Sequence, residues 1–135
     1  MDIRLPRILR VLVVEDDVNI RHVMKEMLSL RGHGVSLAPD GECALKQLQS
    51  ESFDLMITDL GLPGITGWEL AQASKRYQTD MPIIAISSWQ GKEAEEKIGE
   101  YGIDVMIWKP FRFDQILDAI TALCVDGRPE SPSGF

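Results

Sequence analysis

Three consecutive acidic residues follow the first apolar segment of the chain. Glu15, Asp16 and Asp17 come directly after residues 8–14, whose sequence is ILRVLVV. Two carboxylates about 4 Å apart repel each other by roughly 4 kcal/mol at an effective dielectric constant near 20. Either these side chains point into water, as in a solvated turn or a helix N-cap, or a bound cation offsets the repulsion. Mg²⁺ binds one or two carboxylates and keeps several waters, so the acids are candidate ligands.

Three further reactive or charged side chains stand at the ends of other apolar segments. Asp59 follows residues 53–58, Ser87 closes residues 82–87, and Lys109 follows residues 104–108. A lysine beside a metal-bound aspartate is useful if Asp59 is to carry more negative charge than a carboxylate. A phosphoryl group supplies about −1.5 to −2 charges and three acceptor oxygens. Ser87 would donate a hydrogen bond to such a group and Lys109 would pair with it.

Five short apolar segments alternate with segments of helical periodicity, and this order predicts the fold. The expected strands cover residues 8–14, 34–38, 53–58, 82–87 and 104–108. Strict alternation predicts an α/β fold with one doubly wound, five-stranded parallel sheet in the order 2-1-3-4-5, of the flavodoxin-like (βα)5 type. In that order the second strand is an edge, which agrees with its unreactive end at Ala38 and Pro39. Asp16, Asp59, Ser87 and Lys109 should then converge at one end of the sheet.

Helices are expected between the strands. Asp40 is a predicted N-cap, and Thr66 with Glu69 forms a predicted capping box. The apolar stripes contain Ile20, Val23, Met24, Met27 and Leu28; Ala44, Leu45 and Leu48; Leu70, Ala73 and Tyr77; and Phe113, Ile116, Leu117, Ile120 and Leu123. Residues 91–99 have little apolar content, so we expect a fourth helix that is poorly ordered or shifted. Strand alternation predicts that Asp16 points to one side of the sheet and that Glu15 and Asp17 point to the other.

Composition limits the function classes. The chain has 135 residues and a formal net charge of −7, which argues against a broad nucleic-acid-binding surface. No segment resembles a membrane span or a signal peptide, so we expect a cytoplasmic protein. Cys43 and Cys124 are expected to pack in the core, and His22 and His33 to be ordinary surface or helix-end residues. We predict one domain over residues 1–125 and a disordered polar tail over residues 126–135.

Four motifs together resemble the receiver domains of response regulators in two-component and phosphorelay signalling. They are VVEDD with a following arginine, DLMITDLGLPGITG, PIIAISS and WKPF, in the order and spacing of that family. The resemblance covers roughly residues 8–124. It implies that Asp59 is the phosphoacceptor and that Ser87 and Lys109 complete the site. It also implies a cis peptide bond between Lys109 and Pro110.

The resemblance further implies a cofactor, partners and an output. Mg²⁺, with Mn²⁺ as an alternative, would be held by Glu15, Asp16, Asp59 and the backbone carbonyl of Gly61. The phosphoryl donor would be a phosphohistidine on a sensor histidine kinase or a histidine phosphotransfer domain. Phosphorylation would switch the face formed by the fourth helix, the fifth strand and the last helix, through which a homodimer is an option. Such a domain is not an enzyme, although it takes part in its own phosphorylation and dephosphorylation.

Some residues depart from the family pattern, and two other functions stay open. Met106 stands where the family's switch has an aromatic residue, and Trp89 has two candidate roles, stacking over the site or contacting a partner. The same fold also serves as an interaction module that is never phosphorylated. A phosphohydrolase with an aspartyl nucleophile is less favoured, because Leu60 and Gly61 occupy the positions where a second acid is needed.

Overall fold

The structure is a computed structural model that describes residues 8–88 and 96–126. Its elements are β1 (Arg10–Val14), α1 (Val18–Leu30), β2 (Gly34–Ala38), α2 (Gly41–Ser50), β3 (Leu55–Asp59), α3 (Gly67–Ser74), β4 (Ile83–Ser87), β5 (Val105–Trp108) and α5 (Phe113–Ile120), followed by a π-helical turn at Thr121–Asp126. Residues 89–95 lie outside the described residues. They include Trp89 and most of the helix expected over residues 91–99. The tail predicted over residues 126–135 likewise lies almost wholly outside the described residues.

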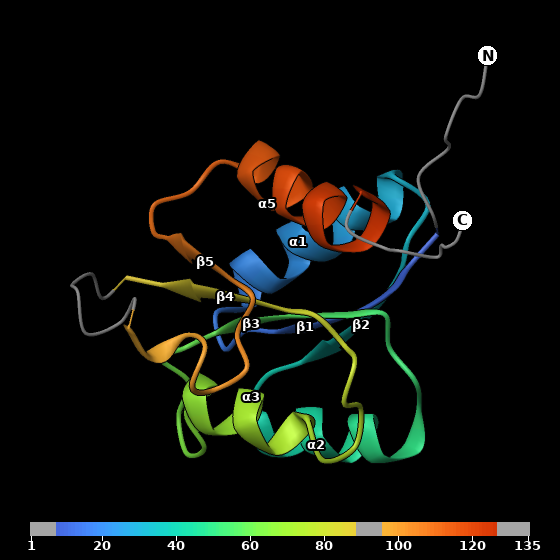
Figure 1. The fold of residues 1–135 in the computed structure, drawn as a ribbon. Coiled ribbons are helices and arrows are strands. Elements are labelled where there is room, and N and C mark those ends of the chain that lie inside the picture. The colour runs from blue at the N-terminus through green and yellow to red at the C-terminus, as the bar shows by residue number, and fades with distance from the viewer. Residues whose placement is uncertain (1–7, 89–95, 127–135) are drawn as a thin grey trace.

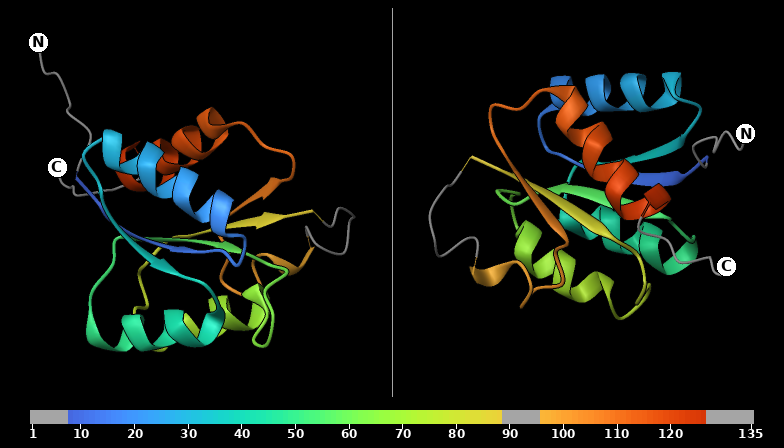
Figure 2. Two further views of the ribbon diagram at one scale, coloured as in Figure 1. Left: turned by 180° about the vertical axis from the view of Figure 1, so that it is seen from behind. Right: turned by 45° about the horizontal axis from the view of Figure 1, so that its top comes forward.

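The five strands form one parallel sheet in the order β2-β1-β3-β4-β5, which confirms the predicted fold (Figure 1). Helices α1 and α5 cover one face of the sheet, and α2 and α3 cover the other (Figures 1 and 2). Every residue of β3 and β4 is buried. Covered on both faces, these strands need the nearly continuous apolar sequence from which they were predicted.

Strand alternation divides the core into two clusters. Leu12, Met56 and Ile83 face α2 and α3, where they pack with Leu70. Their neighbours Val11, Ile57 and Ile84 face α1 and α5, where they pack with Leu28 and Ile116. The sheet therefore separates two apolar layers, and each strand contributes to both.

The predicted helix caps are present. The side chain of Asp40 accepts a hydrogen bond from the backbone N–H of Cys43 (2.8 Å) at the start of α2. At the start of α3, Thr66 Oγ1 accepts from the N–H of Glu69 (3.1 Å), and Glu69 Oε1 accepts from the N–H of Thr66 (3.0 Å). This reciprocal capping box sets where α3 begins, directly after the loop that leaves β3.

Three side chains differ from their predicted environments. Val23 and Tyr77, expected on buried stripes, are 55% and 48% exposed. Helix α3 ends at Ser74, and the N–H of Tyr77 bonds the carbonyl of Ser74, so the chain turns Tyr77 away from the core. His33, expected as a surface or helix-end residue, follows the end of α1 but is buried, and its Nδ1 accepts a hydrogen bond from the N–H of Leu9 (3.0 Å). This bond ties the turn after α1 to the residue before β1.

The two cysteines and His22 have the environments that the sequence predicts. Cys43 and Cys124 form no disulfide with each other; Cys124 is buried and Cys43 is half-buried. His22 is exposed. Among the described residues, no helix has both the length and the apolar character needed to cross a membrane.

Candidate functional site

The chemically active side chains gather at the carboxyl ends of the central strands. Asp59 is the last residue of β3 and Ser87 the last residue of β4, while Glu15 and Lys109 directly follow β1 and β5. Because β3 lies between β1 and β4, Asp59 occupies the middle of this edge. Parallel strands end on the same side of a sheet, and this places together residues that are far apart in the chain.

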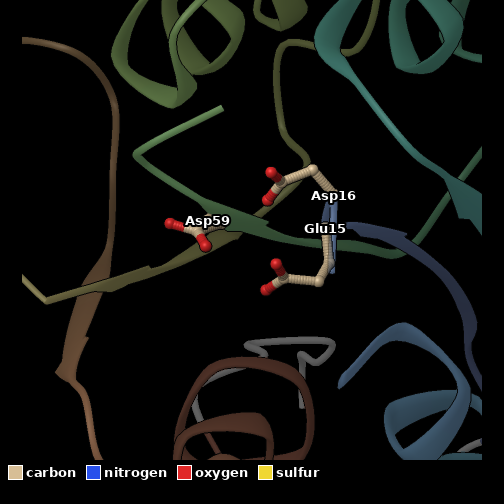
Figure 3. Close-up of side chains that lie close together, drawn as sticks. All are labelled: Glu15, Asp16 and Asp59. Atoms are coloured by element: carbon tan, nitrogen blue, oxygen red, sulfur yellow. The ribbon is translucent and has the colours of Figure 1, made fainter. Parts of the chain in front are cut away.

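Three carboxylates form an acidic cluster around Asp59. One carboxylate oxygen from each of Glu15, Asp16 and Asp59 lies within 4.8 Å of the others. Figure 3 shows Glu15 and Asp16 reaching toward Asp59 from opposite sides, as strand alternation predicts. Glu15 and Asp59 are only 3% and 7% exposed, whereas Asp16 is exposed. Such a set of oxygen donors, partly open to solvent, suits a hard divalent cation.

Asp17, the third acid of the run, caps α1 and does not follow the strand alternation that predicts its direction. Its Oδ1 accepts hydrogen bonds from the N–H groups of Asn19 (2.8 Å) and Ile20 (3.1 Å) and so caps α1. The chain turns after Asp16, and the strand rule no longer applies there. The N–H of Asp17 also donates to Glu15 Oε2 (3.0 Å), which orients the Glu15 carboxylate.

Lys109 links the two buried acids. Its Nζ lies 2.7 Å from Asp59 Oδ2 and 3.9 Å from Glu15 Oε1. Its backbone N–H donates to the carbonyl of Ser87 (2.8 Å), which joins the end of β5 to the end of β4. The peptide bond between Lys109 and Pro110 is cis, as expected. The ammonium group therefore sits over the Asp59 carboxylate.

Burial sets the acidity of the site. Loss of water raises the pKa of Glu15 to about 7; the N–H of Asp17 counteracts this shift and the charge of Asp59 adds to it. Burial alone would lower the pKa of Lys109, but its hydrogen bond to Asp59 and the charges of Asp59, Glu15 and Asp16 outweigh this effect and raise it. Lys109 therefore stays charged, while Glu15 is held near its midpoint at neutral pH.

Two backbone contacts position Asp59. Its Oδ1 accepts a hydrogen bond from the N–H of Gly61 (2.9 Å). Gly67, at the start of α3, lies so close to the end of β3 that a Cβ there would be 2.2 Å from the carbonyl oxygen of Asp59. Only glycine fits at this position without moving the backbone of the candidate phosphoacceptor.

Two residues support the site through contacts that the sequence did not predict: Gly67, and Arg21, the arginine that follows VVEDD in the first motif. Gly67 was considered only as part of the capping box. Arg21 donates from Nη1 to the carbonyl of Glu15 (2.7 Å) and closes the loop that carries the acids. Its place four residues after the helix N-cap Asp17 was the available signal, because that spacing returns a side chain to the start of the helix.

An apolar hollow of about 690 Å³ adjoins the site between α1 and the segment after β5. Its lining residues are Asn19, Ile20, Val23, Met24, Ser88, Lys109, Pro110, Phe111 and Phe113. Lys109 belongs both to this hollow and to the acidic site. The exposure of Val23, which the helical stripe did not predict, is explained by its position on this wall.

Comparison with known proteins identifies the family. The family model described as "Response regulator receiver domain" matches residues 11–121. Among curated proteins, the chain is 34% identical over 118 residues to the two-component response regulator PhoP of Pseudomonas aeruginosa, covering 85% of this chain and 51% of that protein. It is 32% identical over 115 residues to the transcriptional regulatory protein RprY of Bacteroides fragilis, covering 85% of this chain and 49% of that protein. The chain thus spans about half the length of these two relatives.

Solved structures agree. A CheY-like receiver domain protein from Methanospirillum hungatei superposes with a TM-score of 0.86 at 26% identity, covering 93% of this chain and all of that one. The response regulator TrrA of Thermotoga maritima, in complex with Mg²⁺ and BeF, gives 0.75 at 33% identity, covering 84% of this chain and 97% of that one. With a family model that matches residues 11–121 and a fold that matches solved receiver domains, the chain belongs to the family of response regulator receiver domains.

Proposed function

We propose that this receiver domain accepts a phosphoryl group on Asp59 from a phosphohistidine of a sensor histidine kinase or a histidine phosphotransfer domain. The observation that carries the proposal is the position of the Asp59 carboxylate. It lies 2.7 Å from the Lys109 ammonium and within 4.8 Å of carboxylate oxygens of Glu15 and Asp16. The Lys109 ammonium thus supplies one positive charge beside Asp59, and the three carboxylates are candidate ligands for a metal ion that would supply more.

The donor set fits a divalent cation. Glu15, Asp16 and Asp59 would hold Mg²⁺, or Mn²⁺ in its place, and the backbone carbonyl of Gly61 would complete the protein ligands. When bound, such a cation supplies positive charge that offsets the negative charge on the transferring phosphoryl oxygens. This chain contributes the Lys109 ammonium beside Asp59, and the buried Ser87 hydroxyl is the candidate donor to a phosphoryl oxygen.

The proposed chemistry is nucleophilic catalysis by a carboxylate. An Asp59 oxygen attacks phosphorus, a P–O bond forms, and the P–N bond to the donor imidazole breaks. The Lys109 ammonium, already in hydrogen-bond contact with Asp59, stabilises the phosphoryl charge. Hydrolysis later restores the Asp59 carboxylate. Water attacks phosphorus, the P–O bond to Asp59 breaks, and inorganic phosphate leaves. The domain therefore acts as a signalling switch rather than as an enzyme for a separate substrate.

The proposed output is a change in the face formed by residues 91–99, β5 and α5. Phosphorylation would draw Ser87 toward the phosphoryl group and move the segment after β4, which alters the affinity of this face for partners. A homodimer through this face is one proposed assembly. The net charge of −7 supports the absence of a direct nucleic-acid contact, and two cysteines that are not joined in a disulfide support the proposed cytoplasmic location.

The direct test measures the mass of the intact protein. After incubation with Mg²⁺ and acetyl phosphate, we expect the mass to rise by one phosphoryl group. Asp59→Asn should abolish the gain, because an amide is not a nucleophile for phosphorus. The exposed Asp80, outside the site, provides the matched control Asp80→Asn, which should be phosphorylated like the wild type.

The alternative function makes the opposite prediction. An interaction module that is never phosphorylated would show no mass gain with acetyl phosphate, with phosphoramidate or with a cognate kinase. That result would move the assignment to the interaction module, despite the intact constellation of Asp59, Ser87 and Lys109.

A further inference from the structure

Two aromatic rings connect α3 to the turn before β5. The ring centroids of Trp68 and Tyr101 are 5.3 Å apart and the planes are inclined at 57°. Both side chains are half-buried and pack against the core cluster on the α2/α3 face of the sheet. A tilted pair at this distance is an attractive arrangement of two rings. The contact joins two segments that both lead to the site, since Asp59 precedes α3 and Lys109 follows β5.

The backbone next to Trp68 packs tightly against the backbone next to Asp59. Gly67 donates its N–H to the carbonyl of Leu60 (3.0 Å), and a Cβ at Gly67 would lie 2.6 Å from Leu60 Cα. The capping box between Thr66 and Glu69 makes the first turn of α3 a rigid unit around Trp68. A displacement of the Asp59–Leu60 backbone must therefore move Trp68, because close-packed atoms transmit displacement.

The Tyr101 end is tied to the sheet. In the turn around Tyr101, the N–H of Ile103 donates to the carbonyl of Ile98 (2.8 Å). Asp104 then bonds Ile83 twice, accepting from its N–H at Oδ2 (2.8 Å) and donating to its carbonyl (2.9 Å). β5 begins at the next residue. A movement of the Tyr101 ring is thus coupled to the position of β5 and, at its end, of Lys109.

A methionine with an intrinsically flexible side chain packs against the same core cluster as the two rings. Met106 on β5 lies opposite the buried Ala85 of β4 and packs against the same cluster as Trp68 and Tyr101. A thioether side chain has three rotatable bonds and adapts to its surroundings without a preferred second position. It is therefore a poor carrier of a two-state signal. Rigid rings, which either touch or do not touch, are better suited to that task.

We propose that the contact between Trp68 and Tyr101 couples the phosphorylation state of Asp59 to the segment before β5. This inference rests on the proposed function. The Lys109 ammonium lies 2.7 Å from Asp59 Oδ2, so a phosphoryl group on Asp59 would have to enter this contact and change the arrangement in which the rings touch. A phosphoryl group adds bulk and charge at Asp59, shifts the adjoining backbone, and through Gly67 loosens the rings.

The ring contact would shift the equilibrium between the arrangement in which the rings touch and the phosphorylated arrangement in which they are loosened. A contact that is present in one arrangement and weakened in the other shifts their equilibrium by the difference in its free energy. The ring contact therefore opposes phosphorylation, and its removal should strengthen the binding of a phosphoryl analogue about two- to tenfold.

The first experiment follows Trp68 directly. The sequence has three tryptophans, so Trp89→Phe combined with Trp108→Phe leaves Trp68 as the single indole. Emission and intact mass are recorded on one sample with Mg²⁺ and acetyl phosphate. A mass gain with a change in Trp68 emission, absent when Tyr101→Leu is added, supports the inference. A mass gain without an emission change overturns it and leaves the proposed function standing. No mass gain in this variant or in the wild type, with acetyl phosphate, phosphoramidate or a cognate kinase, overturns both.

The second experiment measures coupling with a double-mutant cycle. The affinity for beryllofluoride in the presence of Mg²⁺ is compared for Trp68→Leu, Tyr101→Leu and the double variant. We expect each single change to tighten binding about two- to tenfold and the double variant to add nothing further. Tyr101→Phe, which keeps the ring, should bind like the wild type. The matched control is Tyr77→Leu, an exposed tyrosine beyond the end of α3, which should also be unchanged.

Additive effects, or affinities equal to the wild type in both single variants, would overturn the coupling. Should Trp68→Leu fail to fold, the comparison of Tyr101→Leu with Tyr101→Phe decides the question alone. If a Tyr101 substitution only destabilised the fold, it would weaken the binding of beryllofluoride. The inference predicts the opposite, tighter binding.

Discussion

Glu15 carries two conflicting requirements. It is buried beside Asp59, where ionisation is costly, yet it must be ionised to bind a divalent cation. Its pKa in the folded protein is raised from an ordinary value of 4.5 to about 7. In the absence of a cation, the stability that this group contributes is fully present below pH 4.5 and is lost as the pH rises through about 7.

The variant Glu15→Gln tests this balance. Without metal, we expect it to match the wild type at pH 5 and to be more stable at pH 8 by about 1–2 kcal/mol, because the amide never ionises. The same variant should bind Mg²⁺ much more weakly. Urea denaturation with EDTA at the two pH values measures the first effect, and a Mg²⁺ titration measures the second. Glu26→Gln, an exposed glutamate on α1, is the control, and equal pH slopes for both variants would contradict the prediction.

The connection between β3 and α3 decides how firmly Asp59 is held. Its backbone lies against Gly67, whose lack of a side chain permits contact at a distance no other residue allows. The helix that begins there is fixed by its own capping box, so neither partner can yield easily. Geometry of the candidate phosphoacceptor thus depends on an element that supplies no chemical group to the site.

Gly67→Ala should therefore affect both stability and chemistry. We expect a loss of about 1–3 kcal/mol in the free energy of unfolding, as for other overpacked positions, together with slower phosphorylation of Asp59 by acetyl phosphate. Denaturant unfolding and the rate of mass gain measure these effects. The matched change Gly99→Ala meets no atom within 4 Å and should stay near the wild type in both. A Gly67→Ala variant with normal stability and rate would show that the close contact is dispensable.

At the scale of the whole molecule, the apolar hollow beside Lys109 is the surface on which the phosphodonor of the proposed function would pack. A protein that presents a phosphohistidine to Asp59 must cover this end of the sheet. The hollow between α1 and the segment after β5 shares Lys109 with the site, and Val23 on its wall is 55% exposed. Apolar surface of this kind next to a reaction centre is typical of a recognition site.

Val23→Asp separates docking from chemistry. We expect phosphoryl transfer from a partner kinase or phosphotransfer domain to fall about tenfold, since a charge at the centre of an apolar contact costs roughly 1–3 kcal/mol. Phosphorylation by acetyl phosphate, which needs no docking, should be unchanged. Leu30→Asp, at the far end of the same helix and 77% exposed, is the control for added charge. Equal loss with both donors would place Val23 in the chemistry rather than in docking.

Much of the fold could be predicted because its signals are local. The residues of β2 were predicted to the residue, and the caps at Asp40 and Thr66 were recognised from types and spacing alone. The unreactive end of the second strand agreed with the predicted order, in which that strand is an edge, and the structure has this order. The family resemblance depended on four short motifs whose order in the chain is itself a sequence property. Helical stripes were less reliable, since Val23 and Tyr77 show the expected spacing yet lie at the surface.

By itself, the sequence determined which residues stand at the strand ends and therefore which chemistry the site supports. Only the tertiary structure decided how these residues act together. Asp16 and Asp17 are adjacent and identical in type, yet one joins the acidic cluster and the other caps α1. The raised pKa of Glu15, the contact of Lys109 with Asp59 and the burial of His33 all depend on segments brought from elsewhere in the chain. The physical reason is that side-chain type and periodicity are local properties, whereas burial and charge-to-charge distance exist only once the strands have paired.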